Sequence, residues 1–314
     1  MQAGHRYEIA FDQDIDRQDV EVGTTWTADQ AQGSPIEFMM RVPIIFKADD
    51  FGGAMSESAA RYIELTNAQD AVASLGVITS AITDNEQINA LYRDLDAAGF
   101  EAWFHGHTHD WSLPTAEFSG VGLSAQEASF ERGIELGRTR LGLEFHTFGA
   151  PGNAFDADTA RALVGFPQFV VWFFGDAAAT RNEGAPDISV LRRILDIETS
   201  PGNVDAPSAF LARLDALMAN APAPAVLVLQ VHPYEYSDED LSRLATILEE
   251  MEARALFRYT SPFAWWRWER EKQQISIRKT GRALYEIDLT NTELDHEIDL
   301  GPARDVPLRV AEKE

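Results

Sequence analysis

The sequence predicts an α/β protein, a distorted barrel of seven or eight β/α units with a small β-appendage built from the two ends of the chain. Between residues 43 and 268, short apolar runs alternate with amphipathic helical segments, as in a parallel sheet covered by helices. The chain has 314 residues, 45% of them hydrophobic, which is enough for a large barrel core. Towards both ends, apolar and polar residues alternate instead, which is typical of half-exposed strands.

The barrel strands are predicted from apolar runs that are bounded by turn residues or by polar segments. In chain order, the predicted strands cover residues 44–48, 73–79, 101–105, 146–150, 169–174, 194–198, 225–231 and 255–259.

The predicted helices lie between these strands and have apolar residues at helical spacing. They cover residues 54–69, 85–98, 125–140, 156–164, 206–219, 238–253 and 262–271. The patterns Asp84-x-x-Gln87 and Ser124-x-x-Glu127 predict capping boxes at two helix starts. Gly99 is placed to end the second helix.

We expect three regions along the chain. Residues 1–41 form an N-terminal β-segment, in which residues 7–11 and 20–22 alternate apolar and polar side chains. Residues 42–270 form the barrel. Residues 271–314 form a C-terminal β-hairpin and tail, with alternating runs at 274–278 and 283–289 and a turn at Thr280 and Gly281. The hairpin is expected to pair with the N-terminal strands.

Charge and composition exclude several classes of function. The net charge is −25, which argues against a nucleic-acid partner and against an anionic membrane, since both require a basic surface. The chain has no cysteine, so disulfides and thiolate metal sites are excluded. No apolar run reaches the roughly 18 residues of a membrane span. As given, the sequence predicts a cytoplasmic protein, or a secreted one if a leader has been trimmed.

Polar residues suited to catalysis follow the predicted strands where each strand ends. Because the carboxyl ends of parallel strands meet at one rim of an α/β barrel, active sites are built there. Three of the seven histidines fall within five residues. The residues at these ends are Asp49 and Asp50, His105 to His109, the segment 149–153, Asp176 and His232.

The spacing of His105 and His109 makes a testable prediction about the backbone. In an extended strand, their side chains would lie roughly 13 Å apart, too far to share an ion bound at about 2.1 Å. A helical turn would bring the Cβ atoms to about 6 Å, and Gly106 makes such a turn easy. A shared metal ion therefore requires a tight turn over residues 106–109.

Two imidazoles and one carboxylate form a ligand set typical of catalytic zinc, although cobalt, nickel or manganese would also suit these ligands. The other aspartate of the pair would then serve as a general base, with Lys47 placed to hold or neutralise the pair. Taken alone, an Asp-Asp pair is more often a solvated turn, and an H-x-x-x-H pair is more often not a metal site. Their joint occurrence at strand ends predicts a metal centre.

The motifs resemble those of the polysaccharide deacetylase superfamily, the NodB-like carbohydrate esterases, and they are also similar to those of the YdjC-like chito-oligosaccharide deacetylases. The resemblance covers residues 42–268. It is carried by Lys47-Ala48-Asp49-Asp50-Phe51-Gly52, His105-Gly106-His107-Thr108-His109, Gly149-Ala150-Pro151-Gly152-Asn153 and Leu229-Gln230-Val231-His232.

By this resemblance, Asp49 is the general base and His232 the general acid, while Asp50, His105 and His109 bind the metal. The resemblance also implies a carbohydrate substrate carrying an N- or O-acetyl group. Two features depart from the family pattern: Gly149 stands where an arginine usually orients the base, and the tryptophan motif has only a loose match at 172–176.

Four further residues are predicted to contact the substrate or the oxyanion. The backbone N–H of Gly152 is placed to stabilise the oxyanion that forms when Asp49 takes a proton from water, before His232 protonates the leaving group. His107 is predicted to contact the substrate or to support the metal ligands. Trp111 and Asp176 lie near the rim, where an aromatic face can stack on a sugar ring.

Two other functions are compatible with the sequence. One is a metal-dependent amidase acting on a non-sugar substrate, which the missing arginine favours. The other is a non-catalytic carbohydrate-binding relative, which would be expected to lack some of the residues that are all present here. The oligomeric state is not indicated by the sequence.

Overall fold

The computed structural model describes most of the chain and all of the barrel strands. The described residues are 2, 4–11, 24–27, 37–40, 42–185, 187–219, 225–254, 257–271, 274–281, 284–291, 293 and 308–313.

The centre of the molecule is a parallel, nearly closed barrel sheet with the strand order β12-β4-β5-β6-β7-β8-β9, in which β13 also pairs with β4. Every pairing within this sheet is parallel. The predicted barrel is therefore confirmed. Its strands are β4 (Val42–Phe51), β5 (Ala73–Val77), β6 (Glu101–Phe104), β7 (Thr147–Phe148), β8 (Val171–Phe173), β9 (Ser189–Leu191), β12 (Leu227–Val231) and β13 (Phe257–Tyr259).

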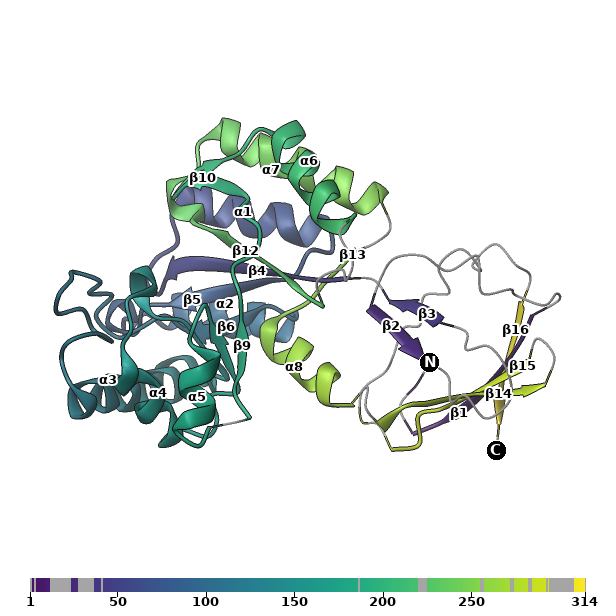
Figure 1. Cartoon of the computed structure of the whole chain (residues 1–314). Helices are drawn as coiled ribbons and strands as arrows, with labels where there is room; N and C mark the ends of the chain where they lie inside the picture. Colours follow the sequence, from purple (N-terminus) through teal and green to yellow (C-terminus); the bar gives the residue numbers. More distant parts are fainter. Residues whose placement is uncertain are drawn as a thin grey trace.

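Helices surround this sheet on its outer side (Figure 1). Helices α1, α6 and α7 form one group in the view, and α3, α4 and α5 form another on the opposite side of the strands. None of the helices in the described part of the chain has the length and hydropathy needed for a membrane span. The helices are α1 (Glu57–Ala68), α2 (Glu86–Ala97), α3 (Leu123–Leu136), α4 (Ala157–Val164), α5 (Ala177–Asn182), α6 (Pro207–Met218), α7 (Asp238–Ala253) and α8 (Pro262–Glu271).

Strand β4 is the central strand, because it pairs with β12, β13 and β5. Its first eight residues are all buried, as expected for a parallel strand covered on both faces. Ile44 and Phe46 belong to the core between sheet and helices, whereas Ile45 packs inside the barrel with Trp103 and Phe173. This alternation fixes the register that carries Asp49 and Asp50 to the rim.

A four-stranded antiparallel sheet lies beside the barrel, with the order β14-β15-β1-β16 (Figure 1). Strands from both ends of the chain pair in it, as the sequence predicts, because β1 lies between β15 and β16. The division of the chain at residues 41 and 270 stays a prediction. The remaining strands are β1 (Arg6–Phe11), β2 (Thr24–Thr27), β3 (Glu37–Met40), β10 (Glu198–Ser200), β11 (Asn203–Val204), β14 (Ser276–Gly281), β15 (Leu284–Asp288) and β16 (Leu308–Lys313).

One predicted strand is wrong. Residues 192–197 form no regular element, and the barrel strand nearest to them, β9, ends at Leu191. Leu195 and Ile197 are nevertheless buried in the core. Their apolar side chains produced the strand signal, although they pack from an irregular segment. Helix α5 was not predicted.

Both predicted capping boxes are also wrong. Helix α2 is capped by Asn85, whose side chain accepts a hydrogen bond from the N–H of Gln87. Helix α3 begins after Gly122 and has no side-chain cap. Gly99 does follow the end of α2, with a φ of 96°, as predicted. The predicted strand at 20–22 and the first two residues of the predicted strand at 255–259 lie outside the described residues.

Candidate metal centre

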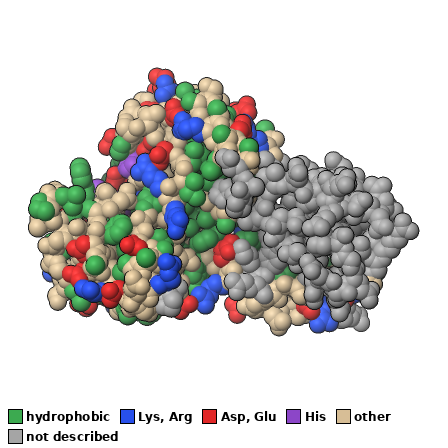
Figure 2. Space-filling model, in the orientation of Figure 1, with side chains coloured by type: hydrophobic (Ala, Val, Ile, Leu, Met, Phe, Trp, Pro, Cys, Tyr) green, Lys and Arg blue, Asp and Glu red, His purple; other side chains and the backbone are tan. Residues whose placement is uncertain are grey.

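Asp49, Asp50, His105, His109 and His232 lie together at the carboxyl ends of β4, β6 and β12. Figure 2 shows histidine atoms at the surface, in the recess between the helix group of α1, α6 and α7 and that of α3, α4 and α5. The parallel sheet therefore brings these side chains to one rim.

Asp50, His105 and His109 form a group that could hold a metal ion, with one ligand atom from each residue and all three atoms within 4.8 Å of one another. The Nε2 atom of His109 lies 2.8 Å from Oδ1 of Asp50, and that of His105 lies 3.4 Å from the same oxygen. Although burial would raise it, these imidazoles hold the pKa of Asp50 far below its usual range. The carboxylate is therefore ionised, as a metal ligand must be.

The orientation of His105 fits a cation. Its Nδ1 lies 2.9 Å from the carbonyl oxygen of Gly149. Because a carbonyl oxygen only accepts, Nδ1 carries a proton, which leaves Nε2 as the ring nitrogen that faces Asp50 and is available to a cation. The N/O ligand set suits zinc or a similar divalent ion.

The turn that brings the two histidines together is present. Gly106 and His109 both have positive φ, of 80° and 59°, and the two imidazole rings are 5.0 Å apart. The carboxylate of Glu117 accepts hydrogen bonds from the backbone N–H groups of His107, Thr108 and His109, at 2.5, 3.0 and 2.9 Å. Three N–H groups that converge on one carboxylate define this turn.

Gly106 is required by its conformation and by the space around it. A Cβ atom at this position would come within 2.7 Å of Oε2 of Glu117 and 2.8 Å of Cγ of Pro151. The glycine therefore allows the carboxylate to approach the turn.

Asp49 is held by a lysine from its own strand. It is only 2% exposed, and the ammonium of Lys47 lies 2.7 and 2.6 Å from its two oxygens. The side-chain amide of Gln230 donates a further hydrogen bond of 2.7 Å to Oδ2. Gly149 stands where an arginine was expected to orient Asp49, and Lys47 and Gln230 are the side chains that bind this aspartate instead.

Lys47 is itself completely buried among aromatic rings. Its Nζ lies 4.9 Å from the ring centre of Trp103, 5.3 Å from that of Phe174 and 5.7 Å from that of Phe173. Burial lowers the pKa of the Lys47 ammonium, and the charge of Asp49 opposes this effect. The aromatic faces stabilise the cation where no water reaches it.

His232 faces the same carboxylate from β12. Its Nε2 lies 3.8 Å from Oδ2 of Asp49, and its Nδ1 lies 2.6 Å from Oε2 of Glu198. Glu198 also accepts a hydrogen bond of 2.7 Å from the hydroxyl of Tyr236. Burial opposes protonation of His232, but the hydrogen bond and charge of Glu198 and the charge of Asp49 outweigh it, so the pKa of the imidazole is raised.

The four other predicted site residues differ in their surroundings. His107 is half-buried, and its Nδ1 lies 3.0 Å from the hydroxyl oxygen of Thr79. Trp111 is 60% exposed and packs against Gly152, where a Cβ atom would come within 2.8 Å of the tryptophan. Asp176 caps α5 by accepting hydrogen bonds from two backbone N–H groups. Its role in substrate binding stays a prediction.

Sequence reasoning missed Glu117, Glu198 and Gln230. Gln230 was visible inside the motif that ends at His232, because a polar residue in a buried strand needs a partner. Glu117 and Glu198 gave no such signal. Glu117 acts through the backbone N–H groups of a turn, and Glu198, the first residue of β10, acts through a histidine that is distant in sequence.

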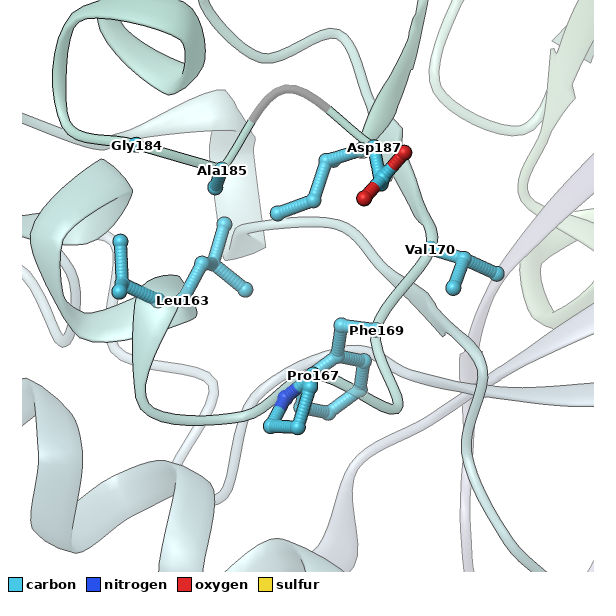
Figure 3. A pocket seen from close by; sticks show the side chains of 9 residues that line it. Leu163, Pro167, Phe169, Val170, Gly184, Ala185 and Asp187 are labelled. Atoms are coloured by element: carbon cyan, nitrogen blue, oxygen red, sulfur yellow. The ribbon is translucent and has the colours of Figure 1, made fainter.

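A separate cavity of about 160 Å³ lies away from these residues (Figure 3). Phe169 and Val170, which directly precede β8, are among the residues that line it. The cavity is therefore at the amino end of that strand, opposite the rim of Asp49 and His232, and it takes no part in the candidate centre.

Three solved structures share the architecture of the chain. A protein from Mycobacterium smegmatis, provisionally described as a polysaccharide deacetylase, has a TM-score of 0.55 at 15% identity, covering 83% of this chain and 99% of its own. The barrel has the NodB-like polysaccharide deacetylase fold. The Xyl-CE4 domain of a multidomain xylanase from the hindgut metagenome of Trinervitermes trinervoides has a TM-score of 0.51 at 11% identity, covering 75% of this chain and 92% of its own.

A family 4 acetyl xylan esterase from Clostridium thermocellum, in complex with a cobalt ion, shares the polysaccharide deacetylase fold with a TM-score of 0.50 at 12% identity, covering 71% of this chain and 89% of its own. Neither a protein-family model nor a curated protein sequence matches the chain. The similarity to NodB-like proteins expected from the motifs is thus confirmed in the fold. The finer similarity to YdjC-like deacetylases stays a prediction.

Proposed function

We propose that the protein is a metal-dependent hydrolase that removes an acyl group, an N- or O-acetyl group, from a carbohydrate. The observation that supports this proposal is the arrangement around Asp49. Its Oδ2 lies 3.7 Å from Nε2 of His105, a candidate ligand, and 3.8 Å from Nε2 of His232. A candidate base therefore lies between a metal site and a candidate acid.

Asp50, His105 and His109 would hold the ion, which when bound supplies Lewis acidity towards an acyl carbonyl and activates water. Asp49 is suited to accept the proton of that water. Its carboxylate has about four lone-pair directions, and the hydrogen bonds from Lys47 and Gln230 occupy three of them. The carboxylate therefore keeps the capacity to accept one proton.

His232 is suited to donate a proton to the leaving group. Its Nδ1–H is directed to Glu198, so Nε2 faces Asp49 and the substrate side. Because the pKa of His232 is raised, the imidazolium that an acid catalyst requires is stabilised near neutral pH.

A zinc and acetate assay tests the function. Asp50→Ala is expected to lose bound zinc and to lose acetate release from acetylated chito- and xylo-oligosaccharides. Glu144→Gln, at an exposed carboxylate that precedes β7 at the end of the barrel opposite the rim, serves as the control and should keep its zinc and its turnover. Full zinc occupancy with unchanged turnover in Asp50→Ala would contradict the proposal, and cleavage of simple amides alone would favour a non-sugar amidase.

A further inference from the structure

Two tyrosine hydroxyls lie next to the loop that carries Asp50. The backbone N–H of Gly52 donates a hydrogen bond of 2.8 Å to the hydroxyl of Tyr92, which is 1% exposed. The hydroxyls of Tyr92 and Tyr234 are hydrogen-bonded to each other. A short chain of hydrogen bonds therefore runs from Gly52 through Tyr92 to Tyr234.

The direction of this chain follows from the need to satisfy a buried hydroxyl. The hydroxyl of Tyr92 already accepts a hydrogen bond from Gly52, and its own proton needs an acceptor. Within the described part of the chain, the oxygen of Tyr234 is the acceptor to which it is hydrogen-bonded. Tyr92 thus donates to Tyr234, and the proton of Tyr234 is left to point elsewhere.

Tyr234 lies beside the loop that carries Asp50 and close in sequence to His232. It is two residues after His232, in the turn Pro233–Glu235, and is only half-buried. Its ring meets Phe51 edge-on, with ring centres 5.2 Å apart. A tyrosine hydroxyl, whose ordinary pKa is about 10, keeps its proton at neutral pH and acts as a donor.

We propose that the hydroxyl of Tyr234 donates a hydrogen bond to the acyl oxygen of a substrate whose acyl group lies against Asp50, His105 and His109. This assignment rests on the proposed hydrolase function. It makes Tyr234 a catalytic residue, because the acyl oxygen gains negative charge as the carbonyl carbon is attacked, and a fixed donor stabilises that charge. Tyr92 is a positioning residue that orients the donor.

Tyr234→Phe removes only the hydroxyl. We expect kcat to fall on the order of 10- to 100-fold, with KM and bound zinc unchanged, because the interaction strengthens as charge develops on the oxygen. Tyr259→Phe is the matched control. Tyr259 belongs to β13, and its buried hydroxyl has no hydrogen-bond partner among the residues that the structure describes. That variant should keep wild-type kcat.

Binding of acetohydroxamate to the zinc-loaded protein, measured by calorimetry, separates this proposal from the proposed function. We expect Tyr234→Phe to bind this acyl-oxygen probe about 5- to 10-fold more weakly than wild type. Weaker binding in a protein that hydrolyses no tested substrate would support the tyrosine assignment and overturn the hydrolase function. Unchanged kcat and unchanged affinity, a change in KM alone, or no probe binding by wild type would overturn the assignment.

Discussion

At the scale of single residues, Lys47 is the side chain on which the candidate base depends most. Its ammonium contacts both oxygens of Asp49, and neither side chain is more than 3% exposed. In such a place a carboxylate charge is stable only when it is paired. Lys47 is itself completely buried, so the charges of both residues depend on this pair.

Lys47→Met should therefore be much more harmful than a surface substitution. We expect the free energy of unfolding to fall by about 3–5 kcal/mol, because Asp49 is left as an unpaired buried charge. Acetate release should fall on the order of 100-fold or more, since the base is no longer held. Urea denaturation and an acetate assay measure the two effects.

The double variant Lys47→Met/Asp49→Asn is the matched control for this interpretation. Removing both charges should recover most of the lost stability but none of the activity. If the double variant were as unstable as Lys47→Met, the cost would come from packing around the lysine and not from the unpaired carboxylate.

Glu198 sets the pH range of the candidate acid. Because its hydrogen bond and charge raise the pKa of His232, Glu198→Gln should lower that pKa. His232 must be protonated to act as an acid, so activity is lost as the pH rises through its pKa. The alkaline limb of the kcat/KM profile should move to lower pH, by roughly one unit.

Glu144→Gln provides the comparison, since Glu144 is an exposed carboxylate outside the site. Its alkaline limb should coincide with that of wild type. An unshifted limb in Glu198→Gln would show that His232 does not control this part of the profile.

At the scale of elements, the turn over residues 106–109 is organised from outside itself. Glu117 accepts from three of its N–H groups, and the hydroxyl of Ser129 in α3 donates to the same carboxylate. The need for a tight turn was predictable from the spacing of His105 and His109. The residue that stabilises it was not, because backbone N–H groups leave no pattern in the sequence.

Glu117→Gln should weaken metal binding without unfolding the barrel. An amide has one acceptor oxygen in place of two and carries no charge, so it cannot hold all three N–H groups. We expect zinc affinity to fall about 10- to 100-fold, as for other residues that support metal ligands. Competition with a chelator measures the affinity, and circular dichroism checks the fold.

Glu131→Gln, at an exposed position of α3, should bind zinc like wild type. Wild-type zinc affinity in Glu117→Gln would mean that the turn forms without the carboxylate.

The strands also divide into those that could be predicted from the sequence and those that could not. Runs such as that of β4 were predicted because burial on both faces requires continuous apolar residues. The short strand β9 was missed, and the segment 194–198 was taken for it, because Leu195 and Ile197 are as buried as strand residues. A run of hydrophobic residues indicates that the segment is buried. It indicates a regular helix or strand only where the apolar positions repeat with a helical or strand period over enough residues.

At the scale of the whole molecule, the order of motifs along the chain was enough to predict the barrel and its active rim. A parallel sheet brings all its strand ends to one side whatever lies between them. The hydrogen bonds that connect the residues at these strand ends could not be predicted. Glu198 and His232, for example, are 34 positions apart in the sequence, and their contact depends on the completed fold.

The opposite end of the barrel contains a buried carboxylate that affects global stability. Glu101 begins β6 and is 7% exposed. Its oxygens accept hydrogen bonds from the hydroxyl of Thr147 at 2.6 Å and from the N–H of Phe263 at 2.7 Å, so it joins the sheet to the start of α8. Burial raises its pKa to about 7, and the hydrogen bonds from Thr147, Phe263 and Ser261 oppose this rise only in part.

This raised pKa makes the stability of the protein depend on pH. The folded state holds the Glu101 proton more tightly than the unfolded state, whose pKa is near the ordinary value of 4.5. The stabilisation is therefore complete below about pH 4.5 and is lost as the pH rises to about 7, by about 3 kcal/mol in total. Glu101→Gln is neutral at every pH and should lack this loss. The difference in unfolding free energy between variant and wild type, measured by urea denaturation from pH 5 to 8, should grow in favour of the variant. A difference that stayed constant across this range would show that Glu101 does not titrate on unfolding.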